Sequence, residues 1–163
     1  MSQRTGSRRK AREAALQVLF ACEAHGPLDP ATVARTYEEV LREFSLPTRA
    51  AERARELALG VAENCKAIDE RVAQASERWR VSRLAGVDRN VLRIAAFELM
   101  FETATPVEVV IDEAIEIARR FSSEPSPAFV NGVLDAIAHA TGRDDASGGE
   151  GSALGEPGSG GVG

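Results

Sequence analysis

The chain has 163 residues, of which 44% are hydrophobic and 5% aromatic, so we expect one domain whose core is built from small aliphatic side chains. The formal net charge of −5, taken alone, argues against a nucleic-acid partner. The two cysteines form no CxxC pair and the two histidines are isolated, which argues against a zinc site. No signal-peptide pattern or membrane-spanning stretch is found, so a cytoplasmic location is expected.

The charge is unevenly distributed along the chain. Residues 1–12 hold four arginines and one lysine and no acid, whereas residues 143–163 hold one arginine and four acids. A basic arm on an acidic body suggests an anionic partner gripped at one edge of the molecule. The alternative is a solvated, disordered N-terminus. Residues 1–7 are predicted to be a flexible basic arm.

Apolar residues recur at helical spacing through most of the chain. Asp29-Pro30 reads as a helix cap followed by a first helical residue, and Thr48 and Thr105 are predicted to cap later helices. A second capping pair is Ser126-Pro127. The expected helices span residues 8–24, 30–44, 48–65, 68–77, 87–102 and 106–121, with a last one from 127 to about 140.

The helix at 87–102 is apolar nearly all round, which is typical of a central helix covered on several sides. Glu98 falls on its apolar stripe, so its carboxylate must be hydrogen-bonded or paired; a bond to a helix end is the favoured interpretation. No strand-type alternation is found. The fold class is therefore predicted to be all-α, with about seven helices in two small bundles packed across the central apolar helix.

The composition changes at Thr141. Residues 142–163 hold nine of the fourteen glycines, together with serines and acids, and cannot bury a core. We expect them to form a disordered tail. The predicted organisation is thus an arm over residues 1–7, a helical domain over 8–141 and a tail over 142–163.

The sequence holds no phosphate loop, nucleophile elbow or metal cluster, so an enzyme is disfavoured and no cofactor is predicted. The basic arm is the positive signal, because such arms bind phosphate backbones. Phe20 is either a core-edge residue or a partly exposed aromatic beside the arm. Phe129 is either a core residue or a half-exposed platform on which a base can stack.

Three segments carry a family resemblance: RRKAREAALQVLF from Arg8, VLRIAAFEL from Val91, and VIDEAIEIARRFSSEPSPAFVNGVLD from Val110. Together they resemble the NusB family of transcription antitermination factors. The resemblance covers Arg8 to about Ala140, and its most specific part is DEAIEIAR followed by FVNGVLD.

The resemblance implies a fold of two helical subdomains and no catalysis. It implies that the chain acts with NusE, a small-subunit ribosomal protein, to bind boxA single-stranded RNA in nascent ribosomal RNA, and helps RNA polymerase within the antitermination complex to resist termination. Carried over by position, it implies RNA contacts at Arg8, Arg9, Lys10, Arg12, Phe20 and Phe129, and NusE contacts at Asp88 and Glu124.

One alternative function stays open at this point. The chain could be a helical protein–protein adaptor, or a homodimer, whose basic arm is incidental or masked and which does not bind RNA directly. The salt dependence of binding to a short single-stranded RNA separates the two functions, because phosphate contacts give a steep dependence.

Overall fold

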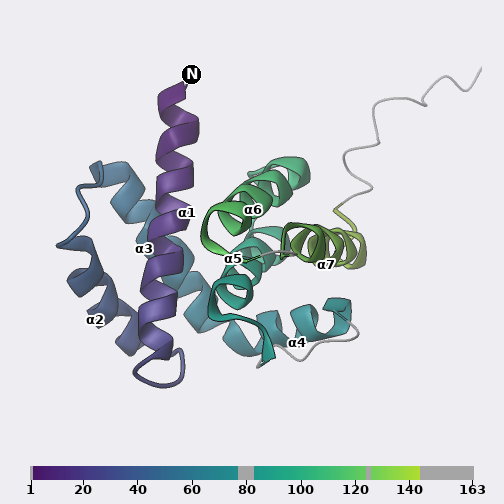
Figure 1. Ribbon diagram of the computed structural model, residues 1–163, viewed down its shortest axis with the longest axis horizontal. Coiled ribbons are helices and arrows are strands. Elements are labelled where there is room, and N and C mark those ends of the chain that lie inside the picture. The colour runs from purple at the N-terminus through teal and green to yellow at the C-terminus, as the bar shows by residue number, and fades with distance from the viewer. Residues whose placement is uncertain (1, 77–82, 124–125, 144–163) are drawn as a thin grey trace, which may run out of the picture.

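The computed structural model describes residues 2–76, 83–123 and 126–143, and these form seven α-helices with no strand among them (Figure 1). The predicted all-α class is therefore confirmed. Glu124 and the tail from residue 144 onward lie outside the described residues. The helices are α1 (Ser2–Glu23), α2 (Pro30–Leu41), α3 (Thr48–Glu63), α4 (Cys65–Ser76), α5 (Gly86–Phe101), α6 (Val107–Phe121) and α7 (Ser126–Ala140).

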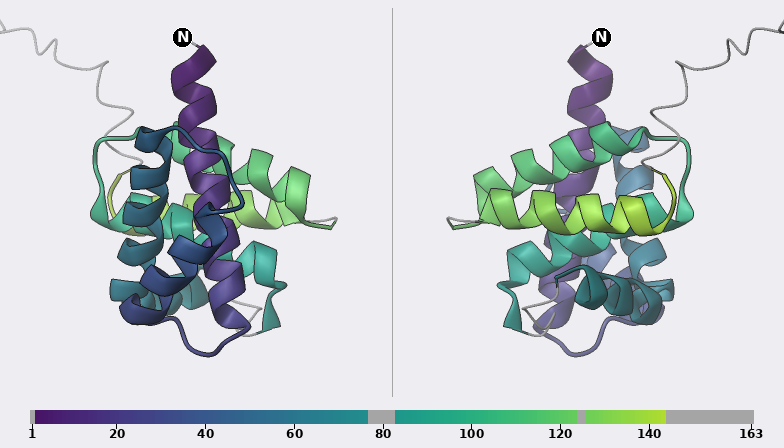
Figure 2. Two further views of the ribbon diagram at one scale, coloured as in Figure 1. Left: turned by 90° about the vertical axis from the view of Figure 1, so that its left-hand side faces the viewer. Right: turned by 90° about the vertical axis from the view of Figure 1, so that its right-hand side faces the viewer.

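Helix α5 lies at the centre of the molecule, where it packs against α1, α3, α4, α6 and α7. Helices α1, α2 and α3 pack on one another as a first bundle, and α4, α6 and α7 gather with α5 as a second (Figure 1). This arrangement confirms the prediction of two small bundles around an apolar helix. The side views show the first turns of α1 projecting beyond the neighbouring helices (Figure 2).

The core consists of buried Ala, Val, Leu and Ile side chains, with one Tyr and one Cys. Small residues let the helix backbones approach closely. A Cβ atom added at Gly60 of α3 would lie 2.3 Å from the Cζ atom of Phe97 on α5, so the glycine makes room for the aromatic ring. The absence of a side chain at Gly60 thus allows α3 to pack closely against α5. None of the helices in the described part of the chain is long and apolar enough to cross a bilayer.

The helix starts agree only in part with the predicted caps. The Asp29 side chain caps α2 as expected, accepting from the backbone N–H of Thr32 at 2.9 Å. The predictions for Thr48 and Thr105 are wrong, because the cap positions of α3 and α6 fall on Pro47 and Pro106 and no side chain caps either helix. Helix α1 begins at Ser2 rather than Arg8, so residues 2–7 continue the helix.

The end of α7 differs from the prediction, because the ordered structure continues through Arg143. Gly142 adopts a positive φ of 72°, and the N–H groups of Gly142 and Arg143 donate to the carbonyls of His139 and Ala138, both at 3.0 Å. This is the Schellman arrangement that commonly ends a helix at glycine. The predicted tail boundary at residue 142 is therefore too early.

The Arg143 guanidinium holds together the end of α5 and the loop that follows it. Its Nη1 donates to the carbonyl oxygens of Glu98 (3.1 Å) and Glu102 (2.9 Å), and its Nη2 donates to that of Thr105 (2.8 Å). The last carbonyls of a helix lack intrahelical partners and carry partial negative charge, so a cation there is favourable.

Replacing Arg143 with alanine should lower the free energy of unfolding by about 2 kcal/mol, because charge-assisted hydrogen bonds contribute about 1.5–3 kcal/mol. Urea denaturation followed by circular dichroism would measure the change. Arg119→Ala is the matched control, since Arg119 is exposed and, among the described residues, pairs with Glu116 one turn away. Equal stabilities of the two variants would contradict the bridging role of Arg143.

Candidate nucleic-acid interface

The basic residues that are predicted to contact RNA lie on different faces of helix α1. Arg8 and Lys10 are exposed, and neither forms an ion pair with any residue in the described ranges. Each residue is rotated by about 100° from the one before it around a helix. The side chains of Arg8 and Lys10, two positions apart, therefore point to nearly opposite sides of α1. Both side chains are accessible to an anion, and their contact with RNA stays a prediction.

Arg9 is partly committed to the protein itself. Its Nε and Nη2 donate to the two carboxylate oxygens of Glu113 on α6 at 2.8 and 3.0 Å. The hydrogen bonds to Glu113 and its negative charge raise the pKa of Arg9. The Arg9 side chain is still 34% exposed, so its outer edge can approach a phosphate, while the carboxylate neutralises part of its charge.

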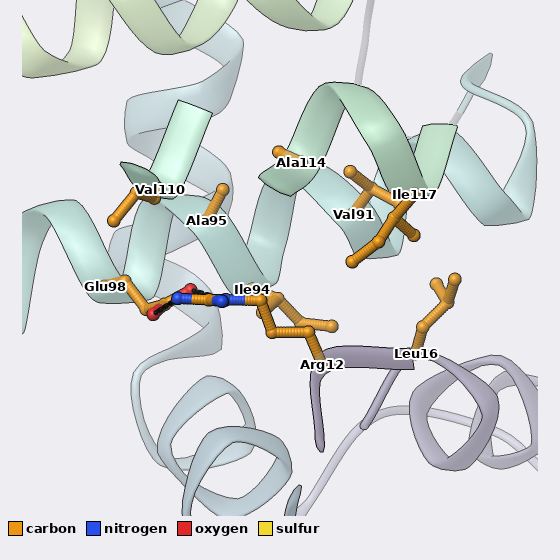
Figure 3. A pocket seen from close by; sticks show the side chains of 9 residues that line it. All are labelled: Arg12, Leu16, Val91, Ile94, Ala95, Glu98, Val110, Ala114 and Ile117. Carbon is orange, nitrogen blue, oxygen red and sulfur yellow. Dashed lines mark hydrogen bonds and ion pairs between the residues drawn. The ribbon is translucent and has the colours of Figure 1, made fainter. Parts of the chain in front are cut away.

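The structure does not support the prediction that Arg12 meets RNA phosphates. The Arg12 residue is only 6% exposed, and its Nε and Nη2 donate to the Glu98 carboxylate at 3.0 and 2.8 Å. Figure 3 shows the two side chains meeting end to end among apolar residues of α1, α5 and α6. The space beside them, about 10 Å³, is at the lower limit of what one water occupies.

The Arg12–Glu98 pair also corrects the expectation for Glu98. The carboxylate is buried and paired, as its place on the apolar stripe required, but its partner is a guanidinium from α1 rather than a helix end. A buried charge needs a partner of opposite sign with good geometry. The pair therefore ties α1 to the central helix, and Arg12 has a structural role.

Phe20 is the exposed aromatic at the far end of the same helix. The residue is 51% exposed, and a Cβ atom added at Gly86, the first residue of α5, would lie 2.8 Å from its Cε2 atom. One part of the ring thus rests against the glycine backbone, and the rest faces solvent. The structure supports a partly exposed Phe20, but it places this residue at the opposite end of α1 from the basic arm rather than beside it.

A partly buried ion-pair network fixes the end of α1 against α5 close to Phe20. Glu23 of α1 accepts from Arg89 and Arg93 of α5, and Arg93 also donates to Asp69 of α4 at 2.8 Å. Burial alone would raise the pKa of Glu23, but the hydrogen bonds from Arg89 and Arg93 outweigh it and lower that pKa. The network holds the surface under the Phe20 ring in place.

Asp88 lies at the head of α5, two residues beyond Gly86. It is buried, with 9% exposure, and its Oδ1 accepts from the Ser122 hydroxyl at the end of α6 at 2.7 Å. That oxygen is turned toward α6, and a NusE contact at Asp88 stays a prediction. Glu124, the other predicted partner contact, lies outside the described residues.

The end of α6 brings a second exposed aromatic, Phe121, to this region. Phe121 is 40% exposed and directly precedes Ser122, the hydrogen-bond partner of Asp88. Arg120 lies over its ring at 5.9 Å from the centroid and donates to Glu13 of α1 at 2.8 Å. The exposed fraction of Phe121 depends on where the core ends, which periodicity alone does not give.

Phe129 is partly buried and packs against the core from the start of α7. It is neither a fully buried core residue nor a free platform, so both interpretations stay open. Asn131 is exposed. Among the described residues there is no group of His, Cys, Asp and Glu side chains that could hold a metal ion.

The fold and this surface define a class: a small all-helical protein whose long first helix carries free basic residues at one end and an exposed aromatic at the other. The comparisons with known proteins agree with that class. The sequence profile described as the NusB family matches residues 9–139, and the chain belongs to the NusB family.

The relatives extend over most of the chain. The transcription antitermination protein NusB of Sorangium cellulosum is 49% identical over 86% of this chain and 97% of its own length. The transcription antitermination protein NusB of Desulfitobacterium hafniense is 42% identical over 87% of this chain and 95% of its own length. NusB from T. maritima has a solved structure that superposes with a TM-score of 0.75 at 43% identity, covering 85% of this chain and 94% of its own.

A further solved structure contains antitermination factors NusB and NusE in complex with double-stranded RNA. Its matching chain superposes with a TM-score of 0.71 at 28% identity, covering 82% of this chain and 97% of that one.

Proposed function

We propose that this chain is a transcription antitermination factor that, together with NusE, binds boxA single-stranded RNA in nascent ribosomal RNA and helps RNA polymerase to resist termination. The observation that carries the proposal is membership of the NusB family along nearly the whole helical domain. The solved complex of NusB and NusE with RNA supports the choice of partners. The function is binding rather than catalysis.

The RNA surface that we propose runs along α1. Arg8 and Lys10 supply free positive charge at its start, Arg9 supplies a partly neutralised guanidinium, and Phe20 offers a ring face for a base. Single-stranded RNA is bound by combining charged contacts to the backbone with stacking on aromatic side chains. Phe129 remains a proposed contact of the same kind, whereas Arg12 is left out because it is buried.

The NusE surface is proposed at the head of α5, near Asp88, together with Glu124. Since the Asp88 carboxylate binds Ser122, its contribution would be to fix the end of α6 against α5 and so shape the surface that NusE meets. Asp88→Asn keeps the shape and an acceptor oxygen. A loss of NusE affinity in Asp88→Ala that Asp88→Asn restores would support this positioning role.

A second candidate function is a helical adaptor or homodimer that does not touch RNA directly. It is favoured by one specific observation, namely that two of the four predicted basic contacts, Arg9 and Arg12, pair with carboxylates of the chain itself. Sedimentation of the protein alone, with NusE and with RNA separates this candidate from the first.

Replacing both Arg8 and Lys10 with alanine should weaken RNA binding and flatten its salt dependence. Each phosphate contact to a single strand contributes about −0.7 to the slope of log affinity against log salt, so losing two contacts should flatten the slope by about 1.4. Fluorescence anisotropy with a boxA RNA and NusE, at several salt concentrations, would measure it.

A matched control is Arg42→Ala with Arg55→Ala, which removes two exposed cations, one directly after α2 and one on α3. That variant should keep the wild-type slope, and both variants should keep their helix content. An unchanged slope in the Arg8 and Lys10 variant would remove the basis for RNA contact by α1. A duplex RNA run in parallel shows whether the preference is for the single strand.

A further inference from the structure

We propose that a basic hollow between α1, α3 and the α5–α6 loop binds phosphate groups of a second segment of RNA, beyond the segment that stacks on Phe20. The proposal rests on the proposed function and extends it to residues of α3. The hollow is open and encloses about 730 Å³. Its lining residues are Ser7, Arg8, Arg12, Arg49, Ala50, Arg53, Leu57, Glu102, Ala104 and Thr105.

The charge of the hollow is opposite to that of the whole chain. Four of its lining residues are arginines and one is an acid, Glu102, with Glu98 buried behind them, whereas the chain carries a net charge of −5. Arg143 adds a further positive charge next to the α5–α6 loop, because its guanidinium donates to the backbone carbonyls of Glu102 and Thr105 in that loop. A positive region on the surface of a protein attracts anions.

Two of the four guanidiniums are exposed, and two are held in place. Arg49 is exposed and, like Arg8, makes no ion pair with any residue in the described ranges. Arg53 is held by Glu102 at 2.7 Å and Glu56 at 3.2 Å and lies 3.6 Å from Glu98, the partner of Arg12. Arg12 is buried and donates to Glu98, so Arg8 and Arg49 are the arginines of the hollow that we propose to contact phosphates.

The chemistry of the lining favours the RNA backbone over other ligands. Among the described residues, no aromatic side chain lines the hollow, so it offers no ring on which a base could stack, and the apolar contribution is limited to Ala50, Leu57 and Ala104. Arginine matches the geometry of phosphate oxygens through paired N–H donors. The hollow should therefore bind phosphates without regard to base sequence.

The position of the hollow sets how long an RNA must be to reach it. Arg8 and Phe20 are twelve residues apart on α1, which corresponds to about 18 Å along the axis and about 120° around it. An RNA that stacks on Phe20 must run back along α1 and pass around it to enter the hollow. Arg8 stands where α1 borders the hollow, so a short boxA RNA can reach Arg8 but should not reach Arg49 on α3, whereas an extended RNA should.

The experiment uses the full chain with NusE and two RNAs, a short boxA strand and the same strand extended by uridine runs on both sides. The test variant is Arg49→Gln, and the matched control is Arg55→Gln, an exposed arginine on the same helix that does not line the hollow. Fluorescence anisotropy at several salt concentrations gives the affinity and its salt slope.

We expect the wild-type chain to bind the extended RNA more tightly than the short one, with a steeper salt slope. Arg49→Gln should weaken binding of the extended RNA several-fold and flatten its slope by about 0.7, the value for one phosphate contact to a single strand. Binding of the short RNA should not change, and Arg55→Gln should behave as the wild type with both RNAs.

Equal effects of Arg49→Gln and Arg55→Gln on the extended RNA would overturn the proposal, as would a loss of NusE affinity in Arg49→Gln with RNA binding unchanged, which would make the hollow a protein-docking site. If the short RNA fails to bind the wild-type chain, the function proposed above is wrong. The comparison of the two variants on the extended RNA would still decide for or against the hollow.

Discussion

Replacing Glu98 with leucine should lower the free energy of unfolding by about 3–5 kcal/mol, because removing one partner of a buried ion pair leaves the other charge uncompensated. Arg12 is only 6% exposed, and its hydrogen bonds to the Glu98 carboxylate, at 3.0 and 2.8 Å, would be lost. Arg53, 3.6 Å from the same carboxylate, would also lose a neighbouring negative charge. Urea denaturation followed by circular dichroism would measure the loss.

Two further variants make this prediction specific. The double variant Arg12→Met with Glu98→Leu removes both charges and should recover most of the lost stability, since apolar residues of similar volume often replace a buried pair at little cost. Glu116→Leu, which breaks the exposed pair with Arg119, should change stability by about 0.5 kcal/mol or less. If Glu98→Leu is no more harmful than Glu116→Leu, the Arg12–Glu98 pair is not the structural bond described here.

The same variants decide the role of Arg12. If folded Arg12→Met with Glu98→Leu binds RNA as the wild type does, Arg12 acts only in the fold. A selective loss of RNA affinity in that double variant would restore Arg12 as an RNA contact.

The helices could be predicted from the sequence because their apolar spacing reports a local property, the face that each helix buries. The predicted cap residues of α3 and α6 were wrong, and in both helices a threonine stands next to a proline. For Thr105 to cap α6, Pro106 would need a helical ψ angle, but its ψ is 145°, which is extended backbone. The helix therefore begins one residue later, and the carbonyl of Pro106 accepts from the N–H of Val110.

The ion pairs could not be predicted, because their partners lie far apart in the chain. Arg9 and Glu113 are separated by 104 positions, and Arg12 and Glu98 by 86. A row of basic residues looks the same in sequence whether each one faces solvent or a buried carboxylate. The position of Glu98 on an apolar stripe predicts that its carboxylate needs a partner. The identity of that partner, Arg12, follows only from how α1 packs on α5.

The hollow and the anchoring of Arg143 were missed for a related reason. Arg49 and Arg53 are four residues apart, which places them on one face of α3, but that face resembles any solvated charged surface until α1 and the α5–α6 loop are placed beside it. Arg143 stands at the border of a Gly-rich segment, where composition suggests disorder, and its docking depends on the free carbonyls at the end of α5.

Replacing Phe20 with alanine should lower RNA affinity by about ten- to hundredfold, which corresponds to the 1–3 kcal/mol of one base stacked on an aromatic side chain. Stability should change little, because half of the residue is already exposed to solvent. Anisotropy with boxA RNA and NusE gives the affinity, and urea denaturation gives the stability. Phe20→Tyr, which keeps the ring, should restore binding.

Phe129→Ala provides the comparison, because Phe129 packs against the core. A buried Phe truncated to Ala costs about 3–5 kcal/mol, and we expect a value toward the lower end since the residue is only partly buried. If Phe20→Ala unfolds the chain while its folded fraction binds RNA normally, Phe20 is a core residue and the proposed RNA surface does not extend to the C-terminal half of α1. If Phe129→Ala lowers RNA affinity at unchanged stability, the surface reaches α7 as well.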